Sequence, residues 1–357
     1  MHFGTLLLFA QAGKSMSEAE LFKAEVDLGV YAEECGLDSV WAPEHHFDAP
    51  YCMSPDNLDV LNHIAARTST IQLGTGAIIL PWHHDPVRLV ERLNILDIMS
   101  DGRVLLGVGR GLARVEYETF GIEMEDSRGR YDEAAEMLLS GLRDGVVEKF
   151  DGKHYQQARA TIHPRSDHSW DDRLHTIAMS PPSVMQAAEF GGSLMCFNYQ
   201  YPIEQQAAVF DEWREKYRET HKTEPPAPVL LDFAYCHEDA DHVEAHMQKY
   251  LGAFYNAMVD HYEFDGKHFG KTHNYESYQN SADMLREVGR EAGFQAFSDL
   301  QLKGTPDQII ETIKMRRELI GDYKQMFLCS YGGQSFDEVK ASMKLFGEKV
   351  VPAFKDL

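Results

Sequence analysis

The chain contains few basic residues for its size. Among its 357 residues, 34 lysines and arginines are outnumbered by 57 aspartates and glutamates, which leaves a formal charge of −23 at neutral pH. The negative field of such an excess repels phosphate groups, so the composition argues against a nucleic-acid partner or an anionic membrane surface. Net charge carries no information about the fold.

Long apolar segments and a cysteine framework are also missing. No apolar run approaches the length of a membrane span, and Leu6 to Ala10 is too short and lacks the basic flank of a secretion signal. The five cysteines are scattered, odd in number and contain no C-x-x-C pair. We therefore expect reduced thiols in a cytoplasmic protein, rather than disulfides or a zinc ribbon.

Nucleotide-binding fingerprints are absent as well. Residues 107–111 read GVGRG, but position 112 is leucine, so no G-x-G-x-x-G forms, and the chain has no P-loop. We expect no dinucleotide-binding domain, and therefore electrons supplied from elsewhere if the protein is a redox enzyme.

What the chain does contain is a repeated alternation of strand and helix patterns. Eight such units joined by short connections predict an α/β fold of the (β/α)8 TIM-barrel type. We expect one barrel domain over residues 1–357 with polar excursions near 147–172 and 263–302; the second, a long insertion before the last units, has the length of a lid or binding loop. The expected strands are 3–10, 39–42, 71–80, 104–110, 174–179, 194–198, 229–236 and 326–330, and the expected helices 17–35, 58–66, 86–98, 183–190, 203–218, 239–262 and 336–346.

The segment 38–47, DSVWAPEHHF, carries the strongest candidate for chemistry. Its apolar part reads as a buried strand, and Glu44, His45 and His46 follow at the strand end, where barrel enzymes place their active sites. A histidine titrates near neutrality and can act as a general base, while an adjacent carboxylate such as Glu44 can orient it. Because successive side chains diverge, we expect one histidine to face the site and the other to be structural. Packing or surface histidines are the plainer interpretation.

Two other strand ends indicate a phosphate site. Arg110 follows two glycines that let the backbone approach a ligand. Ser180 and Ser183 flank the start of a helix, where hydroxyls and free N–H groups favour an anion. The plainer interpretations are a salt bridge from Arg110 and a simple helix N-cap at Ser180.

The chain resembles the luciferase-like flavin monooxygenases, and the α subunit of bacterial luciferase is the closest likeness. The resemblance extends from about Phe3 to Phe354. It rests on the blocks FGTLLLF, EECGLDSVWAPEHHF, GTGAIILP, DPVRLVERLNILDIMSDGRVLLGVGRGL, KGTPDQIIETI and ASMKLFGEKVVPAF in this order.

This resemblance implies a barrel that uses reduced FMN and O2 to oxygenate a small apolar substrate, such as an aldehyde or ketone, through a flavin C4a-hydroperoxide. By position it implies that His45 is catalytic and that a non-proline cis peptide bond, Gly76–Ala77, lies beneath the flavin ring. It also implies phosphate contacts from Arg110, Ser180 and Ser183. The implied partners are a separate NAD(P)H:flavin reductase and a second copy of the chain, paired through the helices at 17–35 and 58–66.

Two expected flavin-site positions depart from luciferase. Gly109 replaces a reactive cysteine, and Met179 replaces a glutamate. We therefore expect oxygenation rather than light emission. Water must be excluded from such chemistry. The apolar residues near strand ends that could form the wall are Trp41, Phe47, Trp82, Met179, Met195 and Phe197, and core packing is the plainer interpretation of each.

Three alternative functions remain open. A deazaflavin (F420)-dependent reductase or dehydrogenase shares the barrel but transfers hydride without O2, and a non-catalytic flavin-binding relative would bind flavin without turnover. A metal-dependent hydrolase would use the pairs His45–His46 and His83–His84. Adjacent residues point in opposite directions and make poor paired ligands, so we expect no metal.

Overall fold

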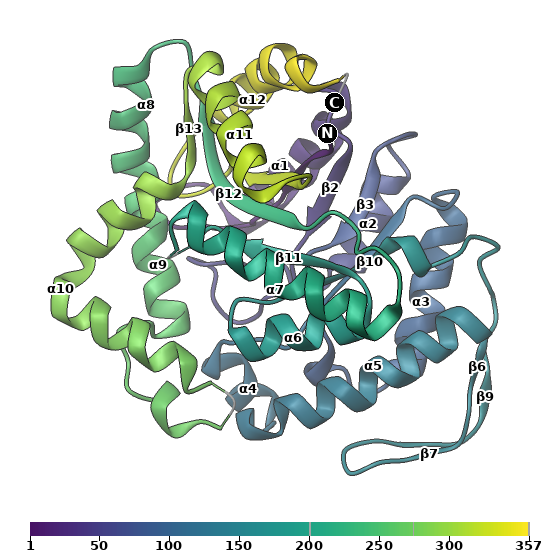
Figure 1. Cartoon of the computed structure of the whole chain (residues 1–357). Helices are drawn as coiled ribbons and strands as arrows, with labels where there is room; N and C mark the ends of the chain where they lie inside the picture. Colours follow the sequence, from purple (N-terminus) through teal and green to yellow (C-terminus); the bar gives the residue numbers. More distant parts are fainter. Residues whose placement is uncertain (200, 274, 356–357) are drawn as a thin grey trace.

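Eight parallel strands close into a barrel at the centre of the molecule (Figure 1). The computed structural model describes residues 1–199, 201–273 and 275–355. Each barrel strand pairs with the next one along the chain, and the eighth pairs with the first, which closes the ring. All eight predicted strands and the (β/α)8 fold are thereby confirmed. In order they are β1 (Phe3–Leu6), β2 (Ser39–Ala42), β3 (Gln72–Thr75), β5 (Val104–Gly109), β10 (Leu174–Ile177), β11 (Ser193–Phe197), β12 (Val229–Cys236) and β14 (Lys324–Leu328).

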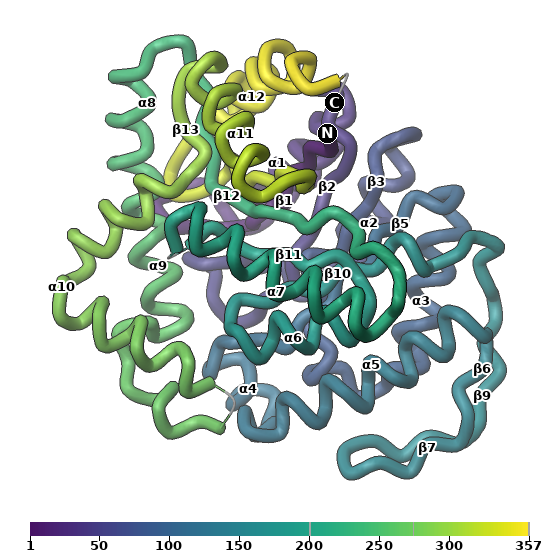
Figure 2. The backbone as a smooth tube through the Cα atoms, in the orientation of Figure 1, coloured from purple at the N-terminus to yellow at the C-terminus, as the bar shows by residue number. Residues whose placement is uncertain are grey.

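Helices connect the strands around the outside of the barrel, as the traces in Figures 1 and 2 show. Several begin where the sequence predicts: Ser17 and Glu20 form a capping box at the start of α1, and Pro86 opens α3 after the N-cap Asp85. These helices are α1 (Glu18–Glu34), α2 (Asn57–Ala65), α3 (Pro86–Met99), α4 (Arg114–Phe120), α5 (Ser127–Asp144), α6 (Pro181–Phe190), α7 (Ile203–His221), α11 (Pro306–Ile320) and α12 (Phe336–Leu345).

The expected third strand is divided into shorter pieces. After β3 the chain passes through residues 76–77 and forms β4 (Ile78–Ile79), which pairs with β5, followed by a 3-10 turn at Leu80–Trp82. The interruption turns the backbone across the end of the barrel, so this segment contributes main-chain atoms to the mouth as well as to the wall.

Large side chains fill the barrel interior and require small neighbours. Trp41 is 1% exposed and packs edge-on against His175, with ring centres 5.0 Å apart. A Cβ atom at Gly74 would lie 2.0 Å from the Trp41 ring, so only glycine fits beside it on β3. The barrel is therefore a packed core, and any ligand must bind at one of its ends.

The first excursion is a β-ribbon that extends away from the barrel (Figure 1). It pairs β6 (Val146–Val147) with β9 (Ala160–Thr161), and β7 (Phe150–Asp151) with β8 (Gln156–Gln157), both antiparallel. The ribbon is therefore a surface feature, as the sequence predicts for residues 147–172.

The helix expected at 239–262 precedes the second excursion. It is present as α8 (Ala240–His246), a π-helical turn at Met247–Leu251 and α9 (Gly252–Tyr262). The excursion itself is mostly helical: α10 (Ser277–Leu300), with a non-helical break at Gly289, leads to β13 (Leu302–Gly304) beside β12. Together α9 and α10 cover one side of the barrel mouth (Figures 1 and 2).

The two ends of the chain lie together at the side of the barrel near α1 and α12 (Figure 1). The amino group of Met1 donates to the carbonyl of Phe354 at 3.3 Å, and the Phe3 ring packs against Phe346 and Phe354. In the described part of the chain, none of the helices combines the length and apolar character needed to cross a bilayer.

Candidate active site

A cavity of about 140 Å3 lies where the carboxyl ends of several barrel strands meet. Seven of the eight site residues predicted from the sequence line it: His45, Gly76, Ala77, Gly109, Arg110, Met179 and Ser183. The eighth, Ser180, adjoins it through Ser183, because the two Oγ atoms are 2.9 Å apart. Residues that are widely separated in the sequence thus meet in one small volume at the barrel mouth.

His45 is held in this cavity by Glu116 and Tyr262. Its Nδ1 lies 3.2 Å from Oε1 of Glu116, and its Nε2 lies 3.5 Å from the hydroxyl of Tyr262, which also lines the cavity. Glu116 is fully buried on α4, and the backbone N–H of His46 donates to the same Oε1 at 2.7 Å. The carboxylate therefore fixes the imidazole through Nδ1 and leaves Nε2 as the atom that can exchange a proton.

Glu44 does not orient His45, so that expectation is wrong. Its carboxylate accepts a hydrogen bond from the N–H of Ile79 at 2.9 Å and lies 3.1 Å from Nε2 of His83 and 3.5 Å from Nε2 of His46. Both residues line the cavity, but side chains diverge along the segment after β2, so the Glu44 carboxylate contacts Ile79 of β4 and His83 while the His45 ring contacts Glu116.

Burial raises the pKa of the Glu44 carboxyl, but the charge of His83 and the contacts with His46 and the Ile79 backbone outweigh it and lower this pKa to about 2. Burial lowers the pKa of His83, but Glu44 raises it overall. Glu44 lines the cavity, so this ion pair forms part of the cavity wall.

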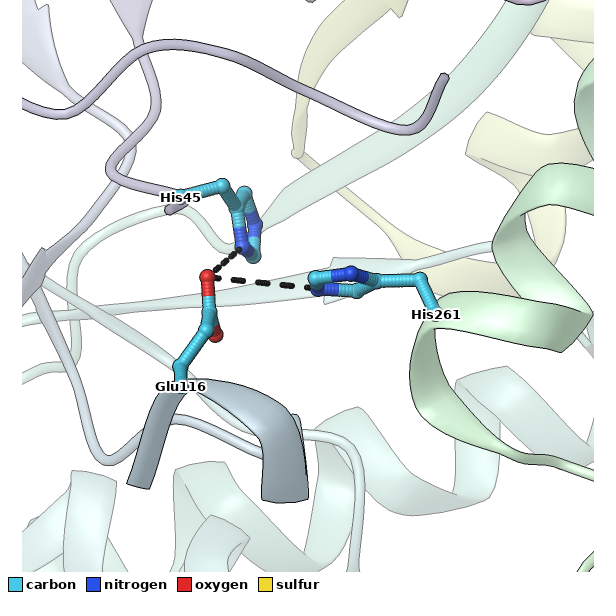
Figure 3. Close-up of side chains that lie close together, drawn as sticks. All are labelled: His45, Glu116 and His261. Carbon is cyan, nitrogen blue, oxygen red and sulfur yellow. Dashed lines mark hydrogen bonds and ion pairs between the residues drawn. The ribbon is translucent and has the colours of Figure 1, made fainter. Parts of the chain in front are cut away.

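A second histidine, His261 at the end of α9, faces the same carboxylate (Figure 3). Its Nε2 lies 3.9 Å from Oε1 of Glu116, and its Nδ1 lies 3.0 Å from Oδ2 of Asp48. Burial raises the pKa of the Asp48 carboxyl, but the hydrogen bonds with His261 and with the Tyr51 N–H lower it overall. Imidazole and carboxylate groups therefore alternate from Asp48 through His261 and Glu116 to His45.

This cluster also has the composition of a metal site. Among the described residues, the three whose ligand atoms all lie within 4.8 Å of one another are His45, Glu116 and His261. The hydrolase alternative relies on His45–His46 and His83–His84, and of these four histidines only His45 belongs to the cluster, because His46 and His83 lie at Glu44.

Arg110 and Ser183 line the same cavity as His45, and Ser180 adjoins it. The Arg110 guanidinium lies 4.1 Å from the ring centre of Tyr275. Ser180 occupies the N-cap position of α6, but its hydroxyl makes no capping bond to that helix and contacts Ser183 instead. The simple N-cap interpretation is therefore wrong for this side chain. A hydroxyl pair, a helix amino end and an arginine together suit an anion such as phosphate.

The floor of the cavity is made of small residues. The peptide bond between Gly76 and Ala77 is cis, as the resemblance implies, and the Asn57 side chain donates to the Ala77 carbonyl at 3.2 Å. A Cβ at Gly109 would lie 3.1 Å from Cδ1 of Ile79 and 3.4 Å from Cβ of Ala77. A flat ligand could thus approach the backbone closely here, and a cysteine at position 109 would require Ile79 to shift.

A larger cavity of about 430 Å3 adjoins the first, and we call it the chamber. Residues of α9 and α10 form much of its wall, and none of its described lining residues carries a charged side chain. Its volume falls within the roughly 300–1,000 Å3 typical of ligand sites. The residues shared by both cavities are Leu8, Tyr51, Leu112, Met179, Phe197, Tyr262 and Tyr278.

Of the six apolar candidates for the wall, only Met179 and Phe197 line either cavity. Trp41 belongs to the barrel core, and Phe47 is 57% exposed. A position near a strand end does not tell whether a side chain lines a cavity, lies in the core or is exposed, because alternate side chains point to opposite faces of the strand. The four candidates that line neither cavity are Trp41, Phe47, Trp82 and Met195, and three of them, Trp41, Trp82 and Met195, are buried as the core interpretation predicts.

Three residues that surround His45 were not found from the sequence: Glu116, His261 and Tyr262. Glu116 follows the fourth strand on a helix of only seven residues, which is too short to show a clear periodic pattern. His261 and Tyr262 form the last turn of an expected helix, and only the tertiary structure shows that this turn reaches the barrel mouth.

Comparison with known proteins agrees with this geometry. Residues 1–323 match the protein family described as luciferase-like monooxygenase. The alkanal monooxygenase alpha chain of Photorhabdus laumondii is 27% identical over 364 aligned positions, which cover 100% of this chain and 98% of that protein.

Two solved structures share the fold over nearly the full length. Monooxygenase RslO1 from Streptomyces bottropensis has a TM-score of 0.81 and 26% identity, with 99% of this chain and 100% of that chain covered. The oxygenating constituent of 3,6-diketocamphane monooxygenase from Pseudomonas putida, in complex with FMN, has a TM-score of 0.77 and 16% identity, with 99% and 98% covered. The chain belongs to the luciferase-like monooxygenase family.

Proposed function

We propose that this protein is the oxygenating component of a two-component monooxygenase. It takes reduced FMN and O2 and oxygenates a small apolar organic substrate, such as an aldehyde or ketone. The observation that carries the proposal is the placement of His45. This histidine, held by Glu116, lines the same cavity as Arg110 and Ser183, and that cavity adjoins the uncharged chamber.

The cavity residues fit FMN. Arg110, Ser180, Ser183 and the amino end of α6 would hold the phosphate, and Gly76, Ala77 and Gly109 leave room for a flat ring above the backbone. Met179 lines both cavities and would be a contact between cofactor and substrate.

Bound reduced FMN would supply two electrons to O2 at its C4a position, so that one oxygen atom enters the substrate and the other leaves as water. For an aldehyde the product is the carboxylic acid. His45 would exchange a proton through Nε2, because its Nδ1 faces the Glu116 carboxylate and holds its hydrogen there. Glu116 is a positioning residue, and the uncharged chamber would exclude water from the reacting atoms.

The electrons would come from a separate NAD(P)H:flavin reductase, since the sequence contains no nicotinamide fingerprint. Purified protein that oxidises NADH with FMN at enzymatic rates, without added reductase, would contradict this. We also propose a homodimer paired through α1 and α2, which sedimentation would detect as a species of twice the 40.6 kDa chain mass.

The decisive experiment is an anaerobic titration with reduced FMN, followed by mixing with isotope-labelled O2 and an aldehyde. We expect stoichiometric flavin binding and one labelled oxygen atom in the acid. Binding without product would favour a non-catalytic flavin protein. Hydride transfer with reduced deazaflavin, without O2 uptake, would favour the F420-dependent alternative.

A further inference from the structure

The chamber next to the active site is unusually rich in aromatic side chains. Of the 25 described residues that line it, 11 are phenylalanine or tyrosine, whereas phenylalanine, tyrosine and tryptophan together make up 11% of the whole chain. Ordinary core packing would supply mostly aliphatic residues. The composition of the chamber therefore indicates a specific ligand preference rather than general apolarity.

These rings form a continuous wall that begins at the catalytic histidine. The Tyr262 hydroxyl lies 3.5 Å from Nε2 of His45, and the Tyr262 ring stacks on Phe264 with centres 5.0 Å apart and planes 30° apart. Phe264 lies 5.1 Å from Tyr199 at 32°, and Tyr199 lies 5.7 Å from Phe297. A ligand placed along this wall would have one end at Tyr262, whose hydroxyl contacts His45, and its body against several ring surfaces.

A flat aromatic ligand gains more from such a wall than an alkyl chain does. Aromatic pairs in offset or edge-on contact contribute about 0.5–1.5 kcal/mol beyond area burial, which corresponds to roughly a two- to tenfold gain in affinity per pair. An alkyl chain gains only the area term. The absence of charged side chains among the described lining residues also excludes a buried ionic group on the ligand.

The rim of the chamber offers a way in for such a ligand. Met284 and Val288, both on α10, line the chamber and are 65% and 51% exposed. Methionine is flexible and forms favourable sulfur–aromatic contacts, so it suits the passage of flat rings of different shapes.

We propose that the substrate is an uncharged, planar compound of fused aromatic rings, bound along the wall formed by Tyr262, Phe264, Tyr199 and Phe297 with its reacting carbon beside His45. This inference rests on the proposed oxygenation function, which it narrows to a substrate class. Linear aldehydes are then poor ligands even though they carry a suitable reacting group.

The test compares two aldehyde probes, anthracene-9-carbaldehyde and decanal, by equilibrium binding to the full-length protein with and without saturating oxidised FMN. We expect the three-ring probe to bind more tightly and to bind also when FMN is present. Tyr199→Leu and Phe264→Leu remove one ring each while keeping an apolar side chain, so each should weaken the three-ring probe about two- to tenfold and leave decanal unchanged.

Two further variants serve as controls. Tyr199→Phe keeps the ring and should bind the three-ring probe as the native protein does. Phe150→Leu removes a partly buried ring on the β-ribbon, outside the chamber, and should change neither probe. Melting curves of each variant separate loss of binding from loss of folding, and the comparison of the two probes on the native protein keeps the test valid if a leucine variant unfolds.

Three outcomes would overturn the inference: tighter binding of decanal, equal loss of both probes in the leucine variants, or displacement of the three-ring probe by FMN. The last would mean that the wall serves the flavin ring. None of these binding results depends on turnover. Failure of the oxygenation experiment would remove the proposed function, whereas failure here would leave it standing with another substrate.

Discussion

Glu116 and His45 are 71 positions apart in the sequence, yet Oε1 of the first lies 3.2 Å from Nδ1 of the second. The same oxygen accepts the backbone N–H of His46, so one buried carboxylate fixes both the ring and the loop that carries it. A hydrogen bond of this kind decides which ring nitrogen is left for proton transfer. The geometry of this pair therefore leads to the first prediction.

Glu116→Gln should lower turnover by at least about tenfold while flavin binding stays within a few-fold. An amide oxygen in the place of Oε1 can still accept from the His46 backbone and from Nδ1 of His45, but it lacks the negative charge that stabilises a protonated His45 ring, and loss of such a carboxylate is costly in other enzymes. The variant's rate–pH profile should also shift relative to the native one. A uniform loss of rate with an unchanged profile would indicate a merely structural role.

His45→Ala should lose about 10²–10⁴-fold in oxygenation, the usual contribution of a positioned general base, and should still bind reduced FMN. His46→Ala is the matched comparison. Its ring packs edge-on against Trp82 and Phe120 at 5.4 and 4.8 Å, so the main effect should be a stability loss of about 1 kcal/mol. Stopped-flow mixing with saturating substrate measures the oxygenation rate of both variants. Near-normal oxygenation by His45→Ala would show that another group moves the proton.

Arg110→Ala should weaken reduced-FMN binding by roughly one to two decades, since a hydrogen bond to a charged group contributes about 1.5–3 kcal/mol. Arg159→Ala, which removes a largely exposed guanidinium on the β-ribbon, is the control and should bind as the native protein does. Anaerobic fluorescence titration gives both affinities, with circular dichroism to confirm folding. Equal affinities in the two variants would rule out the phosphate contact.

The Glu44–His83 pair should make stability depend on pH in two windows. The pKa of Glu44 is lowered from 4.5 to about 2, so its contribution is complete above the unfolded value and disappears as the pH falls toward 2. The pKa of His83 is raised above 6.5, so its contribution is complete below that value and is lost as the pH rises through the folded value. Stability from this pair is therefore greatest between about pH 4.5 and 6.5.

Glu44→Gln removes the charge that causes both shifts and keeps a side chain of the same size. Chemical denaturation gives the free energy of unfolding of the native and variant proteins at each pH. We expect the difference between the two proteins to be largest from about pH 4.5 to 6.5 and smaller on either side of this window. A difference that does not vary with pH would mean that Glu44 acts through its hydrogen bond to Ile79 alone.

The sequence by itself determined the strand–helix alternation, and with it the barrel. Each strand is a short apolar run bounded by turn residues, and the capping boxes at Ser17 and Ser335 set helix starts that need no distant contact. For the same reason His45, Arg110 and Ser183 could be placed at the barrel mouth, because a position after a strand follows from local pattern alone. Their meeting in one cavity follows from the closure of the sheet.

Only the tertiary structure decided what surrounds them. The partner of His45 is Glu116 and not the neighbouring Glu44. This outcome depends on how the segment after β2 turns and on where α4 packs, and neither is a local property of the sequence. The aromatic wall joins Tyr199 to Tyr262 and Phe297 from three separate segments of the chain. Such contacts arise because closing the barrel brings distant segments to one end, where side-chain packing rather than sequence pattern selects which groups touch.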